Sequence, residues 1–365
     1  MKQGMRVLVC ALVLSSVYTC QGLAISTSAR SAALIEQKSG RVLYEQAAQE
    51  ERLIASITKI MTAVVALEYG DIRAEYTVTA EDMAEGSSMY LRPGETLTLE
   101  ELLYGLMLSS GNDAALAVAH CVSGTTEKFV ELMNSTAHRL GLEHSSFANP
   151  NGLDAEGHYS SAEDMARLAA YALGSETFRR IVSTSTITIG ERSLTNHNKL
   201  LRLYDGCIGV KTGYTKAAGR TLVSAARRDG MTLVCVTLSD GNDWNDHAAL
   251  LDHGFATYHM ETPVFAGTEV ANVLVRGGSV PLIPLRAAAD LSYPLTEGEK
   301  LQVTVRVPIS VSAPVIPGDV IGQAVTYLDG QEVAAVDLLA AAPSAAMVPQ
   351  MEKETTRWQW LPRLD

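Results

Sequence analysis

Ser56 and Lys59 lie three residues apart at the head of an apolar stretch. On a helix, residues at positions i and i+3 share a face, so a serine hydroxyl and a lysine amine can meet at this spacing. Burial disfavours the charged form of lysine and lowers its pKa, and a neutral amine can take a proton from serine. The pair predicts a serine nucleophile with a lysine base. Taken alone, it equally fits a lysine that reaches the surface from an amphipathic helix.

A second polar motif, Ser110-Gly111-Asn112, separates two apolar stretches at 102–108 and 114–122. A loop between buried helices exposes a hydroxyl, which can relay a proton, and a carboxamide, which can donate and accept hydrogen bonds. The alternative is an ordinary turn between two helices, with Asn112 as the N-cap of the second.

The third motif, Lys211-Thr212-Gly213-Tyr214, lies on a stretch that reads as a strand beginning near Ile208. Glycine lets a substrate approach the strand backbone, lysine supplies a charge and threonine supplies a hydroxyl. An edge-strand lysine that discourages aggregation is the alternative. Chance occurrence of all three motifs in this order is improbable, and the combination therefore favours the chemical interpretation of each.

The first part of the chain combines helices and strands. Apolar periodicity, capping residues and turn residues indicate a hairpin over 31–46, a buried helix over 54–67, helices opening at Thr98 and Ser161, strands over 184–239 with a tight turn at Asp229-Gly230, and a helix over 244–258. Strands at both ends of a helical middle predict an α+β fold, in which helices cover an antiparallel sheet built from chain-distant strands.

Domain organisation follows from changes in composition. Short Val-rich segments separated by Gly, Pro and Asp follow residue 262, which predicts a catalytic domain over 25–262 and a small all-β domain over 263–342. Residues 343–365 form a tail. Two prolines interrupt any helix there, and Arg357-Trp358-Gln359-Trp360-Leu361 suits a membrane surface, so a peripheral membrane contact and a tail without one both stay open.

Residues 1–24 have the pattern of a signal peptide. Lys2 and Arg6 precede an apolar run that is too short to span a bilayer, and small residues follow it. Its removal would leave Cys121, Cys207 and Cys235. Their apolar neighbours predict inert buried thiols, with a Cys207–Cys235 bridge as the alternative.

Composition excludes several classes of protein. The chain has 365 residues, 47% hydrophobic and 19% charged, with a net charge of −12, so disorder, collagen and nucleic-acid binding are not expected. We expect no metal and no cofactor, because His247, His253 and His259 do not share a helix face and no His-Glu-x-x-His is present. A serine–histidine hydrolase is disfavoured by the lack of Gly-x-Ser-x-Gly.

The three motifs in this order resemble the active-site set of penicillin-binding proteins and serine β-lactamases. Their surroundings at 86–95, 149–154 and 211–215 resemble the low-molecular-weight D-alanyl-D-alanine carboxypeptidases in particular. The likeness covers about residues 25–262, and the segment from 263 resembles that family's second domain. It implies a β-lactamase/transpeptidase-like catalytic domain. A serine β-lactamase and a catalytically silent cell-wall-binding protein on the same fold are the alternatives.

The resemblance implies roles for the catalytic residues. Ser56 would attack the carbonyl of the penultimate D-alanine of a peptidoglycan stem peptide and form an acyl-enzyme. Lys59 would be the base, kept neutral by burial and by the charge of Lys211. Ser110 would pass a proton to the leaving amine. β-Lactam antibiotics would act as covalent inhibitors, and the enzyme would work outside the cytoplasmic membrane, at its outer face or in the cell wall.

The resemblance also implies how substrate is held. Asn112 would bond the peptide backbone of the substrate, and Thr212, with Lys211 behind it, would hold the terminal carboxylate. Gly213 would give room for the substrate, and the N–H groups of Ser56 and Tyr214 would form the oxyanion hole. For a further basic group near the carboxylate, the segment Asn196-His197-Asn198 is a candidate, with a satisfied turn as the alternative.

Overall fold

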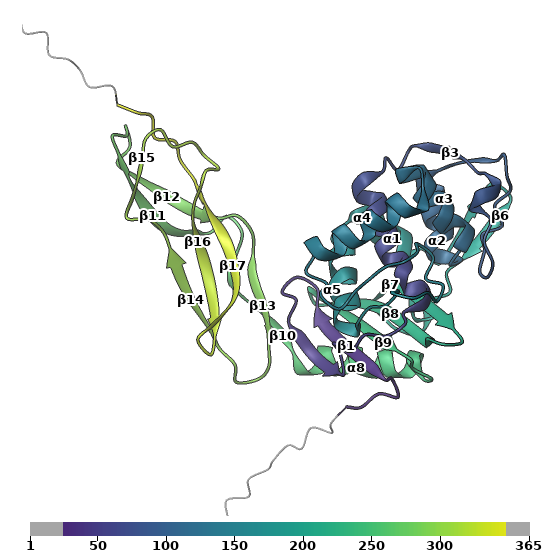
Figure 1. Ribbon diagram of the computed structural model, residues 1–365. Helices are drawn as coiled ribbons and strands as arrows, with labels where there is room; N and C mark the ends of the chain where they lie inside the picture. The colour runs from purple at the N-terminus through teal and green to yellow at the C-terminus, as the bar shows by residue number, and fades with distance from the viewer. Residues whose placement is uncertain (1–24, 348–365) are drawn as a thin grey trace, which may run out of the picture.

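The computed structural model describes residues 25–347, which form a larger α+β unit and a smaller all-β unit (Figure 1). The expected signal peptide, and the tail from residue 348 on, lie outside the described residues. Between residues 25 and 347, no helix combines the length and the apolar character that a bilayer span requires.

The larger unit is built on a five-stranded antiparallel sheet in the order β2-β1-β9-β8-β7. Its strands are β1 (Ser31–Glu36), β2 (Val42–Gln46), β7 (Cys207–Thr215), β8 (Gly219–Arg228) and β9 (Met231–Leu238). The amino-terminal strand β1 pairs with β9, some two hundred residues later, with Ser31 opposite Leu238. Both expected hairpins are present, and Asp229 and Gly230 turn the chain with positive φ. The prediction of a sheet from chain-distant strands is confirmed.

Helices cover both faces of this sheet (Figure 1). The helical elements are η1 (Ala55–Thr58), α1 (Lys59–Tyr69), η2 (Ala80–Asp82), α2 (Leu99–Leu108), α3 (Asn112–Ser123), α4 (Thr126–Arg139), α5 (Ala162–Ala172), α6 (Glu176–Ser183), α7 (Leu200–Leu203) and α8 (Asp243–Thr257). The main core lies between the sheet and the helical layer around α1, and a second core lies between the sheet and α8. Two short two-stranded sheets border the helical layer, one of β3 (Glu75–Thr77) and β4 (Thr96–Thr98) and one of β5 (Thr186–Ile189) and β6 (Arg192–Thr195).

Two helix starts that the sequence predicted are confirmed, but their caps differ. Thr98 and Glu101 form a reciprocal capping box at α2. Ser161 caps α5 by accepting from the Asp164 N–H, whereas the Asp164 carboxylate accepts from the His144 N–H and the Ser145 hydroxyl. Asp164 therefore ties the start of α5 to the segment before it rather than closing the cap.

The smaller unit contains a six-stranded sheet in the order β14-β16-β17-β12-β11-β15 and a two-stranded sheet of β10 and β13. Its strands are β10 (His259–Val264), β11 (Glu269–Arg276), β12 (Leu282–Ala287), β13 (Leu291–Leu295), β14 (Leu301–Arg306), β15 (Ser310–Ser312), β16 (Val320–Leu328) and β17 (Gln331–Ala340). It has its own apolar core, and the all-β prediction is confirmed. The boundary expected at 262/263 falls inside β10.

The three cysteines of the described chain are free thiols, and Cys235 is buried. Cys207 lies opposite Ala226 and Cys235 opposite Ser224, so they belong to strands that are not neighbours in the sheet. The alternative of a Cys207–Cys235 bridge is therefore wrong.

Candidate active site

Ser56 lies in η1, a single turn that leads directly into the buried helix α1. The sequence indicated one continuous helix, but the turn that carries Ser56 is a 3₁₀ turn, and the α-helix begins at Lys59. Residues 59–66 are all buried, because this apolar helix is surrounded by other elements of the core. Lys59 is completely buried, so the alternative of a surface lysine is wrong.

The Lys59 amine has three polar partners within hydrogen-bond distance. Its Nζ lies 3.0 Å from Ser56 Oγ, 2.8 Å from Asn112 Oδ1 and 2.5 Å from the carbonyl oxygen of Asn151. The last two partners can only accept hydrogen bonds. A neutral amine has two N–H groups and one lone pair, so donating to both acceptors leaves the lone pair facing the Ser56 hydroxyl. This arrangement suits removal of the hydroxyl proton.

Asn112 is oriented by a second contact. Its Nδ2 donates to the Glu85 carbonyl at 2.6 Å, which leaves Oδ1 facing Lys59. Asn112 is the first residue of α3, and Gly111 occupies the N-cap position. The alternative of an Asn112 N-cap is therefore wrong, and the side chain is available to the site.

Burial shifts the protonation of both motif lysines. Desolvation, followed by repulsion from Lys211, holds the pKa of Lys59 well below its ordinary value. Desolvation also lowers the pKa of Lys211 to about 7. Two lysines close together inside the protein therefore favour a neutral Lys59, the form that acts as a base.

The third motif lies on β7, an edge strand of the sheet that passes close to Ser56. Lys211 is buried and donates to the Thr212 carbonyl at 2.9 Å, so the alternative of a solvent-exposed edge lysine is wrong. Gly213 is required by close approach, because a Cβ there would lie 2.4 Å from Thr221 Oγ1 and 2.9 Å from Ser56 N. Glycine thus lets β7 run directly past η1, the turn that carries Ser56.

The three motifs meet at one cleft of about 530 Å³. Residues from each of them line it, namely Ser56, Ser110, Thr212, Gly213 and Tyr214. Lys59, Asn112 and Lys211 lie buried behind this wall. Among the hydrogen bonds of residues 25–347, none joins the Ser110 hydroxyl to Ser56 or Lys59. The arrangement places a hydroxyl beside a buried amine and next to a lined space, which is the geometry that attack by an activated serine requires.

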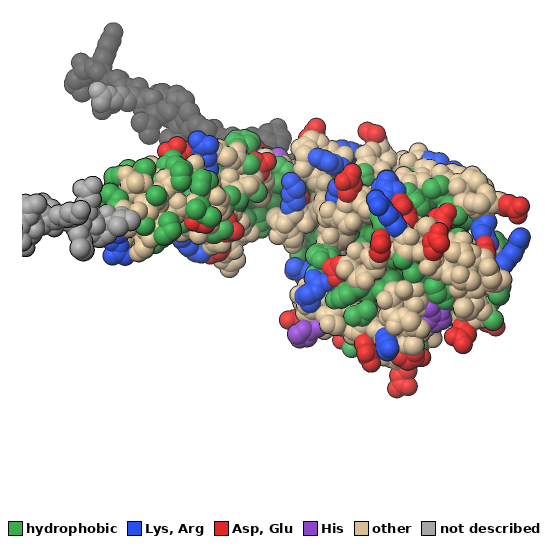
Figure 2. Space-filling view, turned by 90° about the horizontal axis from the view of Figure 1, so that it is seen from above, with side chains coloured by type: hydrophobic (Ala, Val, Ile, Leu, Met, Phe, Trp, Pro, Cys, Tyr) green, Lys and Arg blue, Asp and Glu red, His purple; other side chains and the backbone are tan. Residues whose placement is uncertain are grey.

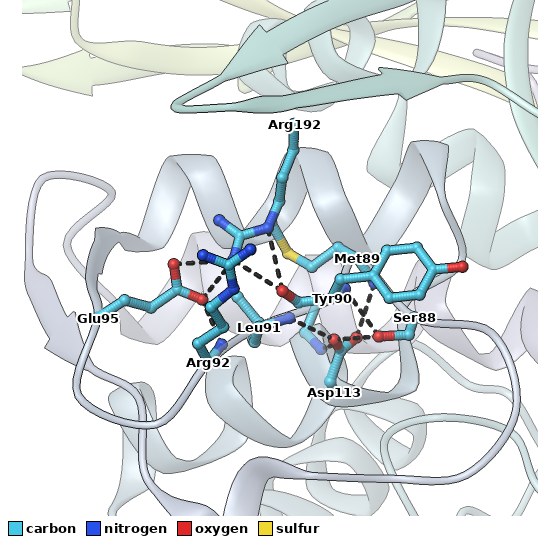
Figure 3. A network of polar contacts seen from close by, with 9 residues as sticks. Ser88, Met89, Tyr90, Leu91, Arg92, Glu95, Asp113 and Arg192 are labelled. Atoms are coloured by element: carbon cyan, nitrogen blue, oxygen red, sulfur yellow. Dashed lines mark hydrogen bonds and ion pairs between the residues drawn. The ribbon is translucent and has the colours of Figure 1, made fainter.

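A loop on the rim of the cleft is held by two charged side chains (Figure 3). The buried Asp113 carboxylate, directly after Asn112, accepts from the Ser88 hydroxyl and from the N–H groups of Met89 and Leu91. Arg192 of β6 donates to the Tyr90 carbonyl and pairs with Glu95. Ser87 of this loop lines the cleft and accepts from the Asn112 N–H at 2.7 Å.

The Asn196-His197-Asn198 segment forms the satisfied turn that was one of its two alternatives, and it also brings His197 to the cleft. The Asn196 side chain satisfies a turn by donating to the carbonyls of Val182 and Thr184. His197 lines the cleft, and burial together with the charge of Lys211 lowers its pKa.

Sequence reasoning missed several cleft residues. Arg220, which pairs with Asp243 at 2.7 Å, and Trp244 also line the cleft. Arg220 lies opposite Tyr214 in the β7–β8 hairpin, so pairing the strands around the 215–219 turn would have placed it there. The contact of the Asn151 carbonyl with Lys59 could not be predicted from the sequence, because every residue has a backbone carbonyl.

The described residues contain no group of three or more His, Cys, Asp or Glu side chains arranged to hold a metal. His247 is fully buried and contacts the hydroxyls of Ser224 and Thr237 through its two ring nitrogens.

Comparisons with known proteins agree over most of the chain. A family model described as D-alanyl-D-alanine carboxypeptidase matches residues 19–242, and one described as penicillin-binding protein 5, C-terminal domain, matches residues 258–343. The D-alanyl-D-alanine carboxypeptidase DacF of Bacillus subtilis is 36% identical over 339 residues, covering 88% of this chain and 86% of that protein. DacA of Escherichia coli K12 is 33% identical over 84% of this chain and 81% of its own length. The crystal structure of penicillin binding protein 5 from Haemophilus influenzae is similar with a TM-score of 0.74 and 28% identity, covering 88% of this chain and 98% of that one.

Proposed function

Because the chain belongs to the D-alanyl-D-alanine carboxypeptidase family, we propose that Ser56 is the nucleophile with which it performs that family's reaction. The protein is a serine-type D-Ala-D-Ala carboxypeptidase and a low-molecular-weight penicillin-binding protein. One observation carries the assignment of Ser56. Its Oγ is 3.0 Å from the amine of a fully buried lysine whose other polar partners can only accept hydrogen bonds.

Acylation begins when the neutral Lys59 takes the proton of the Ser56 hydroxyl. Ser56 Oγ then forms a bond to the carbonyl carbon of the penultimate D-alanine, and the carbonyl oxygen becomes an oxyanion. The backbone N–H groups of Ser56 and Tyr214 donate to this oxygen, and each such donor contributes about 3–4 kcal/mol in comparable sites.

The C–N bond then breaks as the leaving amine gains a proton through Ser110, which lines the cleft. Terminal D-alanine departs, and an ester on Ser56 remains. Water hydrolyses this ester and restores the free hydroxyl. β-Lactams open on Ser56 in the same way and stay attached as covalent inhibitors.

Substrate binding falls to the other motif residues. Thr212 donates its hydroxyl to the terminal carboxylate, and Lys211 behind it supplies positive charge. Asn112 uses its second Nδ2 hydrogen for the peptide backbone of the substrate while its Oδ1 holds Lys59. Gly213 leaves room for the peptide to lie along β7.

We further propose that residues 1–24 export the protein and that it acts on peptidoglycan stem peptides outside the cytoplasmic membrane. The proposed domains are 25–262, which holds every proposed site residue, and 263–342. The tail, which contains Trp358 and Trp360, touches the membrane surface. Fractionation of cells tests this contact, because deletion of 348–365 would move the protein from the membrane to the soluble fraction.

The activity assay compares wild type with Ser56→Ala. Wild-type protein releases D-alanine from a synthetic stem pentapeptide, and the Ser56→Ala variant releases none above the blank. D-Alanine release that survives in a folded Ser56→Ala variant removes Ser56 from the nucleophile role. Fast penicillin hydrolysis without D-alanine release would indicate a β-lactamase instead.

A further inference from the structure

Thr58 and His158 form a buried pair close to Ser56 that does not line the cleft, and the mechanism above gives them no task. Thr58 is completely buried and His158 is 2% exposed. The Thr58 hydroxyl lies 2.8 Å from His158 Nε2 and 2.8 Å from the carbonyl oxygen of Ala55. The pair thus reaches the residue just before the proposed nucleophile.

The direction of these hydrogen bonds follows from the partners of the imidazole. The backbone N–H of Ala148 donates to His158 Nδ1 at 3.0 Å, so Nδ1 is the acceptor and the hydrogen of a neutral ring is on Nε2. Nε2–H then donates to the Thr58 hydroxyl, which in turn donates to the Ala55 carbonyl. Burial lowers the pKa of His158 to about 4, which keeps the ring in this neutral form.

The Ala55 carbonyl and the Ser56 N–H belong to one peptide group. In a planar trans peptide the C=O and N–H bonds point in opposite directions, so fixing one fixes the other. Ser56 is close to the start of η1, where backbone N–H groups have no partner within the helix. Ser56 N also lies next to Gly213 of β7, at the wall of the cleft.

Ala55 needs such support because its backbone is strained. Its φ is +49°, in the left-handed region that alanine rarely adopts, and the surroundings must hold it there. Gly152 packs against the same carbonyl, since a Cβ at Gly152 would lie 2.1 Å from Ala55 O. The carbonyl is therefore held by one hydroxyl and one close backbone contact.

We propose that His158, acting through Thr58, is a positioning residue that fixes the Ala55–Ser56 peptide so that the Ser56 N–H points at the substrate's oxyanion. The proposal rests on the proposed function, in which Ser56 is the nucleophile and its N–H is an oxyanion donor. Neither side chain touches the reacting atoms. Loss of the contact leaves substrate binding intact and slows the step in which the oxyanion forms.

The test measures acylation by benzylpenicillin under single-turnover conditions, which separates the dissociation constant of the first complex from the acylation rate constant. Thr58→Val, which keeps the shape and removes the hydroxyl, lowers the rate constant about 10- to 100-fold and leaves the dissociation constant within about twofold. Thr58→Ser restores the hydroxyl and brings the rate to within about threefold of wild type.

A matched control is Thr237→Val. Thr237 also contacts a buried histidine, with its hydroxyl 3.0 Å from His247 Nε2, but it lies on β9 against α8. Thr237→Val loses thermal stability like Thr58→Val but acylates at the wild-type rate. Equal acylation rates in the two variants would overturn the proposal.

A second pair covers the case in which Thr58→Val does not fold. His158→Gln keeps an N–H donor and His158→Leu removes it, so His158→Leu acylates about 10-fold or more slowly than His158→Gln. Equal rate constants in this pair overturn the proposal as well. Failure of the proposed function is a separate result, because wild-type protein would then gain no adduct at Ser56.

Discussion

Lys59 owes its proposed reactivity to a buried setting in which each of its hydrogen-bonding positions has a defined partner. A buried lysine is costly unless it is neutral and its N–H groups are bonded, and Asn112 and the Asn151 carbonyl meet that requirement. The remaining lone pair faces Ser56. The second buried lysine, Lys211, adds repulsion that further disfavours the charged form of Lys59.

Replacing Lys211 with glutamine tests this repulsion. Lys59 must be neutral to act, so acylation falls as pH drops through the pKa of Lys59. The charge of Lys211 lowers that pKa and is present below pH about 7, because burial lowers the pKa of Lys211 to about 7. In Lys211→Gln the pKa of Lys59 rises, and the acidic limb of the acylation rate moves to higher pH. Stopped-flow measurement of the acylation rate with benzylpenicillin over a range of pH locates this acidic limb.

Lys211→Arg is the control, since it keeps the charge and holds the limb near its wild-type position. The acylation rate is lower at every pH in both variants because substrate binding is weakened. Only the pH at which the acidic limb occurs is therefore compared. An unmoved limb in Lys211→Gln would show that Lys211 does not tune Lys59.

At the scale of elements, η1, the turn that carries Ser56, is held between β7 on one side and the 149–154 segment on the other. Gly213 lets β7 pass Ser56 N, and Gly152 lets the second segment pass Ala55 O. Both contacts are made by backbone, which cannot rotate away as a side chain can. A methyl group at either glycine therefore displaces the turn itself.

Gly152→Ala should damage both stability and acylation. Gly152 has φ +85°, and its added Cβ would lie 2.1 Å from Ala55 O. Left-handed backbone costs alanine about 1–2 kcal/mol of unfolding free energy, and the clash adds to this. A small displacement of a reacting group can slow a reaction about 100-fold, and we expect a loss of that order in the acylation rate.

Gly157→Ala provides the comparison. Gly157 has φ +73°, but no atom lies within 4 Å of a Cβ built there, so this variant has the backbone cost without the clash. Urea unfolding and penicillin acylation are measured for both. If the two variants lose stability equally and acylate equally fast, the contact between Gly152 and Ala55 does not hold the turn.

The elements were predictable where the signal is local. The Asp229-Gly230 turn, the Thr98 capping box and the apolar helix after Ser56 each depend on neighbouring residues. The left-handed backbone at Ala55 was not predictable, because Gly152, which packs against the Ala55 carbonyl, reaches it only through the tertiary fold. The order of three motifs indicated the site, but the Asn151 carbonyl, 92 residues from Lys59, reaches it only through the tertiary fold.

At the scale of the whole molecule, one arginine joins the two units. Arg41, in the β1–β2 hairpin, pairs with Glu299 at 2.6 Å and donates to the Pro294 carbonyl. Its guanidinium also lies over the rings of Tyr258 and Tyr293. The hydrogen bond from Arg41 lowers the pKa of Glu299 to about 2, so the pair stays charged at neutral pH. The junction is thus tied by charge and by aromatic contact.

Surface character also differs between the units. Figure 2 shows both signs of charge mixed over the larger unit, whereas exposed hydrophobic side chains gather on the smaller one. Leu274 and Leu282, which pair across β11 and β12, are about half exposed. Every residue of the proposed mechanism lies in the larger unit, so the junction has no part in the chemistry.

Arg41→Met should loosen the junction and leave catalysis unchanged. The substitution keeps an apolar stem beside the tyrosines and removes the ion pair with Glu299. Small-angle scattering should show a broader distribution of distances within the molecule, and the rate of acylation by penicillin should match wild type. Arg306→Met, which breaks a pair with Glu332 inside the smaller unit, should leave scattering unchanged. Identical scattering from both variants would mean that Arg41 does not tie the units.

The central claim, that Ser56 is the nucleophile, is tested most directly by mass spectrometry of the protein after incubation with benzylpenicillin. The mass should increase by one intact antibiotic molecule, and the adduct should map to the peptide that contains Ser56. Ser56→Ala should gain no mass under the same conditions. An adduct on any other residue, or a wild-type protein whose mass does not change, would contradict the assignment.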